Sequence, residues 1–167
     1  SSGRVLLGGV DVQQQSLAEL RSKVAIVLQK NLLFSGTILE NLRWGNPEAS
    51  QAEVEAACRS AAAHDFILSL PQGYQTMLGQ GGVNLSGGQK QRLCIARALL
   101  RQAAVIILDD STSAVDTATD KQIRQALAAE SRSRKVTTLI VAQRIASVQE
   151  ADKIVVLDGG RIDGVGT

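Results

Sequence analysis

The sequence contains very few aromatic residues. They make up 2% of the 167 residues, whereas hydrophobic residues of all kinds make up 44%. A buried core must therefore be built from aliphatic side chains, and the chain is long enough to form one domain around such a core. Cysteine is also scarce, and Cys58 and Cys94 lie within helical patterns rather than in a paired spacing. This placement predicts buried free thiols in a reducing compartment.

Long apolar runs and blocks of like charge are absent too. No apolar run approaches the roughly 20 residues that a membrane-spanning helix needs, and no signal peptide opens the chain. The formal net charge is +2 without a basic block, which argues against a nucleic-acid partner. We therefore expect a soluble, cytosolic domain.

Short segments of two kinds alternate along the chain. Runs rich in aliphatic and β-branched residues at 24–28, 105–108 and 136–142 predict strands. The stretches that follow Ser86 and Asp116 have the apolar spacing of helices. Strands that alternate with helices are typical of an α/β core with a largely parallel sheet.

The residues that carry chemistry are concentrated between positions 83 and 116. Ser86 and Gln89 stand in the S-x-x-Q relation of a capping box, so the serine hydroxyl can accept from the Gln89 N–H. The glycines between them leave backbone N–H groups open at a helix N-terminus, where the helix dipole favours an anion. Asp109 and Asp110 follow a predicted strand at its carboxyl end, where acidic residues hold Mg²⁺ against nucleotide phosphates. Taken alone, these aspartates could also be a solvated strand end.

The order of these motifs resembles that of the ATP-binding cassette (ABC) family over essentially the whole chain. LSGGQKQR (85–92) is similar to its signature motif, VIILDD (105–110) to its Walker B motif and SAVD (113–116) to its D-loop. The resemblance implies an α/β fold with a P-loop NTPase-like parallel-sheet core. A helical subdomain at about 47–101 would be inserted into a core lobe formed by 1–46 and 102–167. It further implies ATP and Mg²⁺ as cofactors and a head-to-tail pair of such domains.

Site roles carry over position by position from the resemblance. Asp109 would bind Mg²⁺, and Gln29, as the Q-loop glutamine, would reach the metal and the attacking water. Asp110 would lie near that water and Gln143 near the γ-phosphate. The residues expected on the partner domain's nucleotide are Leu85, Ser86, Gly87, Gly88, Gln89 and Asp116. Gln29 could instead be an ordinary glutamine at a strand end.

The segment LLFSGTILENL (32–42) resembles the one that exporter-type ABC domains place against transmembrane domains. It implies a place at the cytoplasmic face of the cell membrane, and it disfavours a soluble ABC protein. Leu32, Leu33, Phe34 and Trp44 could instead belong to the core. We expect some of each, with partial exposure at the docking face.

Two residues depart from the family pattern. Asp110 stands where efficient hydrolysers have glutamate, and Gln143 stands where the family has a histidine. The aspartate carboxylate is withdrawn by about 1.5 Å, one C–C bond, and a misplacement of about 1 Å can cost roughly 100-fold in rate. Glutamine cannot carry the positive charge available to histidine. These changes predict the degenerate half of a heterodimeric exporter, whose intact LSGGQ serves the partner's ATP site. Neutral variation in an active enzyme is the alternative.

A third departure is the absence of a G-x-x-x-x-G-K-[ST] motif, the Walker A loop that cradles phosphates. We interpret the chain as an N-terminally truncated fragment that is inactive when isolated. Without a P-loop strand, the run 105–108 is expected to lack a neighbour and expose a sheet edge, so the fragment should self-associate or be marginally stable. A non-catalytic, nucleotide-gated dimerisation module remains the alternative function.

Overall fold

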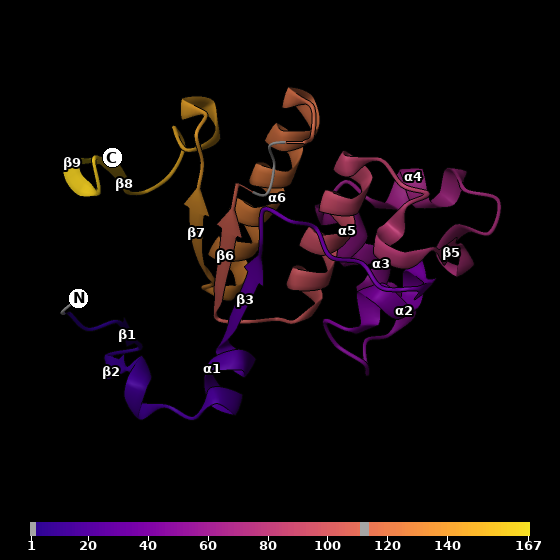
Figure 1. The fold of residues 1–167 in the computed structure, drawn as a ribbon, viewed down its shortest axis with the longest axis horizontal. Helices are drawn as coiled ribbons and strands as arrows, with labels where there is room; N and C mark the ends of the chain where they lie inside the picture. Colours follow the sequence, from indigo (N-terminus) through magenta and orange to yellow (C-terminus); the bar gives the residue numbers. More distant parts are fainter. Residues whose placement is uncertain (1–2, 111–113) are drawn as a thin grey trace.

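A computed structural model describes residues 3–110 and 114–167, which form a mixed α/β structure (Figure 1). Its α-helices are α1 (Leu17–Lys23), α2 (Ile38–Arg43), α3 (Gln51–Ser60), α4 (His64–Ser69), α5 (Gly87–Leu100) and α6 (Thr117–Arg134). Its strands are β1 (Leu6–Leu7), β2 (Val10–Asp11), β3 (Val24–Val27), β4 (Gly36–Thr37), β5 (Met77–Leu78), β6 (Val105–Asp109), β7 (Thr137–Val141), β8 (Ile154–Asp158) and β9 (Arg161–Gly166). Three-residue 3₁₀ turns are η1 (Val12–Gln14), η2 (Gly73–Gln75), η3 (Gln80–Gly82) and η4 (Ile145–Ser147).

The central sheet is parallel and has the strand order β3-β6-β7. This confirms the expected α/β class with a parallel sheet. The expectation that 105–108 would lack a neighbour is wrong, because β6 is the middle strand and pairs on both sides. Parallel strands are joined by long crossovers, so their order along the chain does not give their order in the sheet.

One face of the central sheet is covered by helices and the other is open. The covered face carries the buried side chains of Ala25, Val27, Ile106 and Leu108, and α5 and α6 pack against it. Side chains alternate along a strand, so Ile26 and Leu139, both aligned with Ile107, point to the opposite face. There Ile26, Leu139 and Val141 are 54%, 53% and 50% exposed. The apolar surface that the central sheet exposes is therefore its open face, which carries side chains of β3 and β7. It is not an unpaired edge of β6.

A helical region lies to one side of the sheet in Figure 1, with α2 and α3 packed against α5. Its core is aliphatic, as the composition predicts. The large side chains fully buried within it include Ile38, Leu42, Val54, Ile67, Leu93 and Ile95. α2 also packs in this region, although it lies before residue 47, the expected start of the helical subdomain. α5 also contacts β3 and so joins the helical region to the sheet. The division into two lobes remains an interpretation.

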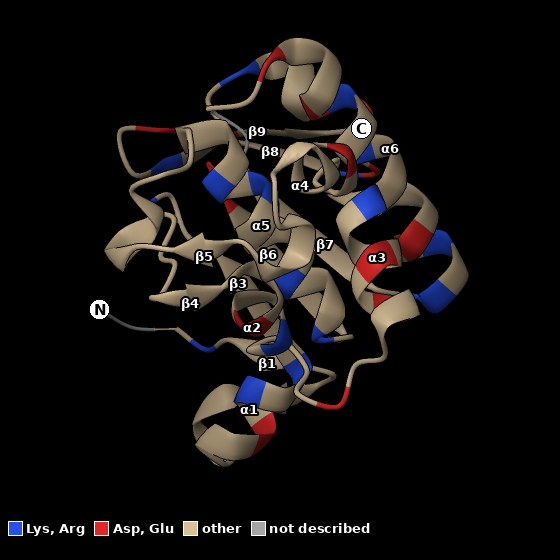
Figure 2. Cartoon of the chain, turned by 90° about the vertical axis from the view of Figure 1, so that its right-hand side faces the viewer, with Lys and Arg blue, Asp and Glu red and all other residues tan. Residues whose placement is uncertain are grey.

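Short polar signals set the helix starts. Ser50 and Glu53 form a reciprocal capping box at the start of α3, and Thr37 and Glu40 form another at the start of α2. Residues of both charge signs are interspersed along α3 and α6 (Figure 2), which is the pattern of helices with one face in solvent.

The remaining strands form short antiparallel pairs: β1 with β2, β4 with β5, and β8 with β9. The two hairpins of the chain's first and last parts lie apart from the parallel sheet in Figure 1. Cys58 and Cys94 are free and buried, as predicted. Among the described residues, no helix combines the length and apolar character needed to cross a membrane.

Candidate functional site

The carboxyl ends of β3 and β6 bring two of the predicted site residues together. Gln29 follows β3, and its Nε2 lies 3.4 Å from Oδ2 of Asp110, which follows β6. Asp109 is the last residue of β6 and is partly buried. Three of the residues expected at a metal and water site thus lie at one edge of the parallel sheet, the usual place for α/β chemistry.

The backbone of Asp110 turns away from the sheet in a left-handed conformation, with φ of 45°. Aspartate and asparagine are enriched in this region among non-glycine residues. Two hydrogen bonds hold the turn: the Asp110 N–H donates to the Val141 carbonyl at 2.9 Å, and the Asp110 carbonyl accepts from Gln91 Nε2 at 3.4 Å. The position of the Asp110 carboxylate is therefore set by both β7 and α5.

Gln143 is exposed and lies two residues beyond the end of β7. Because the Val141 carbonyl accepts from Asp110, this segment leaves the sheet at the same edge as the aspartates. The placement puts Gln143 at the carboxyl end of the strand that neighbours β6. Its role toward a phosphate stays a prediction.

The donors at this edge fit Mg²⁺. Carboxylate and amide oxygens are hard ligands, and Mg²⁺ in nucleotide sites takes one or two carboxylates from the protein and completes its octahedron with phosphates and water. Within residues 3–110 and 114–167, no three histidine, cysteine, aspartate or glutamate side chains gather into a metal site. Asp109, Asp110 and Gln29 offer oxygen ligands of this kind at the carboxyl edge of the sheet.

The start of α5 has the predicted capping box. The Ser86 hydroxyl accepts from the Gln89 N–H at 3.2 Å, and Gln89 Oε1 accepts from the Ser86 N–H at 2.9 Å. Ser86 and Gly87 are exposed, whereas Leu85 is 7% exposed and anchors the turn in the core. An exposed helix start with free N–H groups suits an anion.

Gly88 lies against the backbone of residue 114. A Cβ on Gly88 would come 2.9 Å from the Ala114 carbonyl oxygen, whereas a Cβ on Gly87 would lie 3.7 Å from the nearest atom, the Ala114 Cβ. The start of α5 thus touches the segment that follows Asp110. Of the SAVD motif, Ser113 lies outside the described residues.

Asp116 is the N-cap of α6. Its carboxylate accepts from the Thr119 N–H at 3.0 Å and from the Thr119 hydroxyl at 2.7 Å. These bonds, first of all the one from the Thr119 N–H, lower the pKa of Asp116. The structure thus gives Asp116 a capping function, and its role toward a nucleotide stays a prediction.

Gln91 belongs to this site although no sequence motif singled it out. This side chain is 1% exposed and hydrogen bonds to both Asp110 and Ala114. The sequence pattern that could have indicated its role is a glutamine close to Leu93 and Cys94, at a core position of α5. An amide buried among apolar side chains needs hydrogen-bond partners that are buried too.

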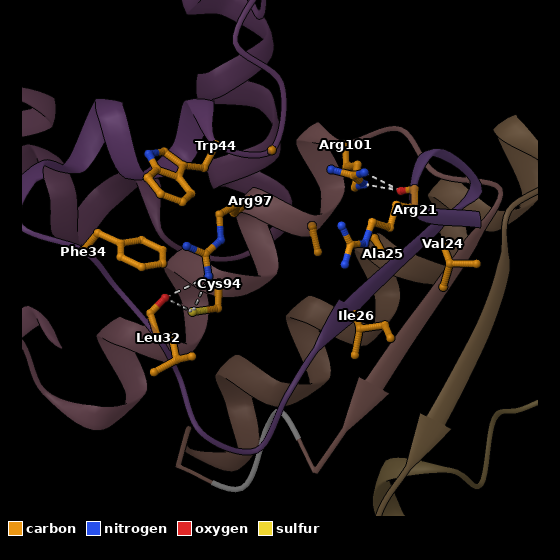
Figure 3. Close-up of a pocket in the computed structure, with 12 residues that line it drawn as sticks. Arg21, Val24, Ala25, Ile26, Leu32, Phe34, Trp44, Cys94, Arg97 and Arg101 are labelled. Atoms are coloured by element: carbon orange, nitrogen blue, oxygen red, sulfur yellow. Dashed lines mark hydrogen bonds between the residues drawn. The ribbon is translucent and has the colours of Figure 1, made fainter. Parts of the chain in front are cut away.

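A pocket of about 430 Å³ lies between β3, α5 and the segment around Phe34 (Figure 3). The rings of Phe34 and Trp44 stack at one side with centroids 4.2 Å apart. Arg97 donates to the Leu32 carbonyl at 2.8 Å and fixes that side to α5. Leu33 is buried, whereas Leu32, Phe34 and Trp44 are exposed, which agrees with the expected mixture of core and surface residues.

The chain is similar in sequence to a known protein family and to individual proteins of known name. Residues 1–113 match the family described as ABC transporter. The chain is 47% identical over its whole length to an ATP-dependent lipid A-core flippase of Chromohalobacter salexigens, of which it covers 28%. It is 45% identical over 160 residues to multidrug resistance protein homolog 65 of Drosophila melanogaster, of which it covers 12%.

A solved structure has the same fold. A bacterial Atm1-family ABC exporter with ATP bound superposes with a TM-score of 0.94 at 40% identity, covering 99% of this chain and 29% of that one. The chain therefore spans less than a third of the length of these relatives.

Proposed function

Because the chain belongs to the ABC transporter family, we propose that it is the ATP-binding part of an exporter that moves a substrate across a membrane. The observation that carries this proposal is the meeting of Gln29, Asp109 and Asp110 at the carboxyl edge of the parallel sheet. The relatives named above are a flippase, a multidrug resistance protein and an exporter. Such a part would work at the cytoplasmic face of the membrane.

Each site residue then has a function that its placement supports. Asp109 would hold Mg²⁺, which neutralises phosphate charge when bound. Gln29 and Asp110 would orient the attacking water, since they already lie within reach of each other. Gln143 would donate to the γ-phosphate from the same edge. Phosphate-cradling groups of the Walker A type do not occur in this sequence, so these 167 residues alone should not hydrolyse ATP.

The start of α5 would act on a second domain's nucleotide. Ser86, Gly87 and Gly88 present a helix N-terminus, and Ser86 and Gly87 are exposed. This requires a second nucleotide-binding domain as partner. With Asp110 and Gln143 in its own site and an unaltered LSGGQ for the other, we propose that this chain is the degenerate half of a heterodimer. A partner that also carries Asp and Gln at these positions, with an unaltered signature, would contradict this.

Transmembrane domains would dock beside the pocket at Phe34. Leu32, Phe34 and Trp44 expose apolar surface there, with Trp44 61% exposed. Arg97 holds the Leu32 backbone to α5, so a push on this surface would reach α5. A nucleotide-gated dimerisation module, in which ATP is bound but not hydrolysed, is the second candidate, and it is favoured by the short Asp110 side chain.

ATP turnover by the full-length exporter that contains this chain separates the two candidates. The variant Asp110→Glu with Gln143→His should raise turnover well above that of the unchanged protein, because it restores reach and charge at one site. A matched control is Asp152→Glu with Gln149→His, since both positions are exposed and lie outside the strands of the parallel sheet. Fast turnover in the unchanged protein, with no effect of the double change, would show that both residues are neutral variants.

A further inference from the structure

Gln91 joins α5 to both sides of the segment that follows β6. Its Nε2 donates to the Asp110 carbonyl at 3.4 Å, and its Oε1 accepts from the Ala114 N–H at 3.1 Å. The side chain is 1% exposed. One buried amide thus satisfies two backbone groups that lie on either side of residues 111–113.

Such an amide is costly to bury unless it is hydrogen-bonded, and here both of its ends have partners. The same face of α5 has a second contact with this segment, because Gly88, three residues earlier, lies against the Ala114 carbonyl. Two neighbouring points on α5 therefore lie against Ala114, and one of them, Gln91, is hydrogen-bonded to both Ala114 and Asp110.

We propose that Gln91 is a positioning residue that fixes the Asp110 turn in register with the start of α5. Asp110 has a left-handed backbone, and the Gln91 amide holds its carbonyl in that turn. Its carboxylate then points toward Gln29. Gln91 contacts the backbone carbonyl of Asp110 and would therefore act through the Asp110 backbone.

This inference rests on the proposed function and adds a link to it. The start of α5 would serve the partner's nucleotide, and Asp110 would serve the chain's own. Gln91 stands one helical turn inside α5 from Gly88, between these two groups. A shift of α5 on engaging the partner would therefore be carried to Asp110 through this side chain.

The two hydrogen bonds of Gln91, to Asp110 and to Ala114, form a bridge between α5 and the segment after β6. Amide hydrogen exchange at Ala114 in the nucleotide-free exporter tests this bridge. Gln91→Met keeps the side-chain length but removes both hydrogen bonds, and it should speed exchange at Ala114 by about 10-fold. Gln91→Glu keeps the acceptor for the Ala114 N–H and should leave its exchange slow. Asn41→Leu is the matched control, since Asn41 is another buried amide, 2% exposed, that bonds to Phe34 and Thr37.

The bridge is overturned if Gln91→Met leaves Ala114 exchange unchanged, or if Asn41→Leu speeds it equally through general loosening. If Gln91→Glu does not fold, the comparison of Gln91→Met with Asn41→Leu decides alone. These results need no ATP hydrolysis, so they stand apart from the success of the proposed function.

Steady-state kinetics test the positioning role. In the exporter whose own site is restored by Asp110→Glu and Gln143→His, Gln91→Met should lower kcat for ATP by about 10-fold and change KM by less than about twofold, because the groups that bind ATP are untouched while the water-orienting side chain at position 110 is displaced. A changed KM with an unchanged kcat would overturn the role. Absence of turnover in the unchanged exporter would contradict the proposed function, and Ala114 exchange would still decide the bridge.

Discussion

The side-chain amide of Gln29 donates to the carboxylate of Asp110 across 3.4 Å, although the two residues are 81 positions apart in the chain. The contact exists because β3 and β6 are parallel neighbours, so their carboxyl ends meet at one edge of the sheet. The oxygen of a side-chain amide can coordinate a metal, and its NH₂ group can donate hydrogen bonds to an anion or to water. A change at Gln29 should therefore disturb both the metal and the water at this site.

Gln29→Ala should weaken the apparent affinity for Mg²⁺ in ATP turnover by the full exporter that carries Asp110→Glu and Gln143→His, in which this site is active. Removing one oriented group from a metal and water site is expected to raise the Mg²⁺ concentration needed for half-maximal turnover by about 10-fold. Titration of Mg²⁺ at saturating ATP measures the shift. Gln125→Ala, at an exposed position on α6, is the control. An equal shift in both variants would show that Gln29 does not belong to the metal site.

Gly88→Ala should destabilise the protein, whereas Gly87→Ala should not. The added Cβ at position 88 would lie 2.9 Å from the backbone oxygen of Ala114, which cannot move without disturbing the segment after Asp110. At position 87 the nearest atom is at an ordinary 3.7 Å. We expect a loss of about 1–3 kcal/mol for Gly88→Ala, measured by urea unfolding. Equal stability of the two variants would show that the close approach is not rigid.

Unfolding stability should fall above pH 9 through Cys58. Its side chain is fully buried, and burial raises the pKa of its thiol from 9.0 to about 11. Below pH 9 both folded and unfolded chains keep this proton, and the contribution of the neutral thiol is complete. Between pH 9 and 11 the unfolded chain ionises first, so up to about 3 kcal/mol is lost. Urea unfolding of wild type and Cys58→Ala across this range isolates the effect, because other alkaline groups titrate in both. Parallel curves would contradict it.

The sequence predicted the local features of the site better than its long-range ones. The run 105–108, the aspartates at its carboxyl end and the Ser86 capping box follow from periodicity and spacing over a few residues, and the structure has all three. The neighbours of β6 did not follow, because strand order depends on crossovers and not on local pattern. Gln91 was missed for a similar reason: its partners at Asp110 and Ala114 lie 19 and 23 residues away.

The strand order changes the reason for expecting self-association. The exposed apolar surface is the open sheet face that carries Ile26, Leu139 and Val141, about half exposed each, and β7 pairs only with β6 among the described strands. A face of this kind is a site for contact with a second copy. We therefore expect the 167-residue chain to self-associate in dilute solution, and Leu139→Lys to shift it toward monomer.

Sedimentation velocity over a range of concentrations measures this shift, with circular dichroism to confirm that each variant is folded. Leu68→Lys is the control, because Leu68 on α4 is 59% exposed but lies in the helical region, away from the sheet. Self-association that both variants reduce equally would point to net charge rather than the open face. A wild-type chain that stays monomeric at all concentrations and unfolds in one cooperative step would contradict the prediction. It would show that a stable monomer can leave the open sheet face exposed to solvent.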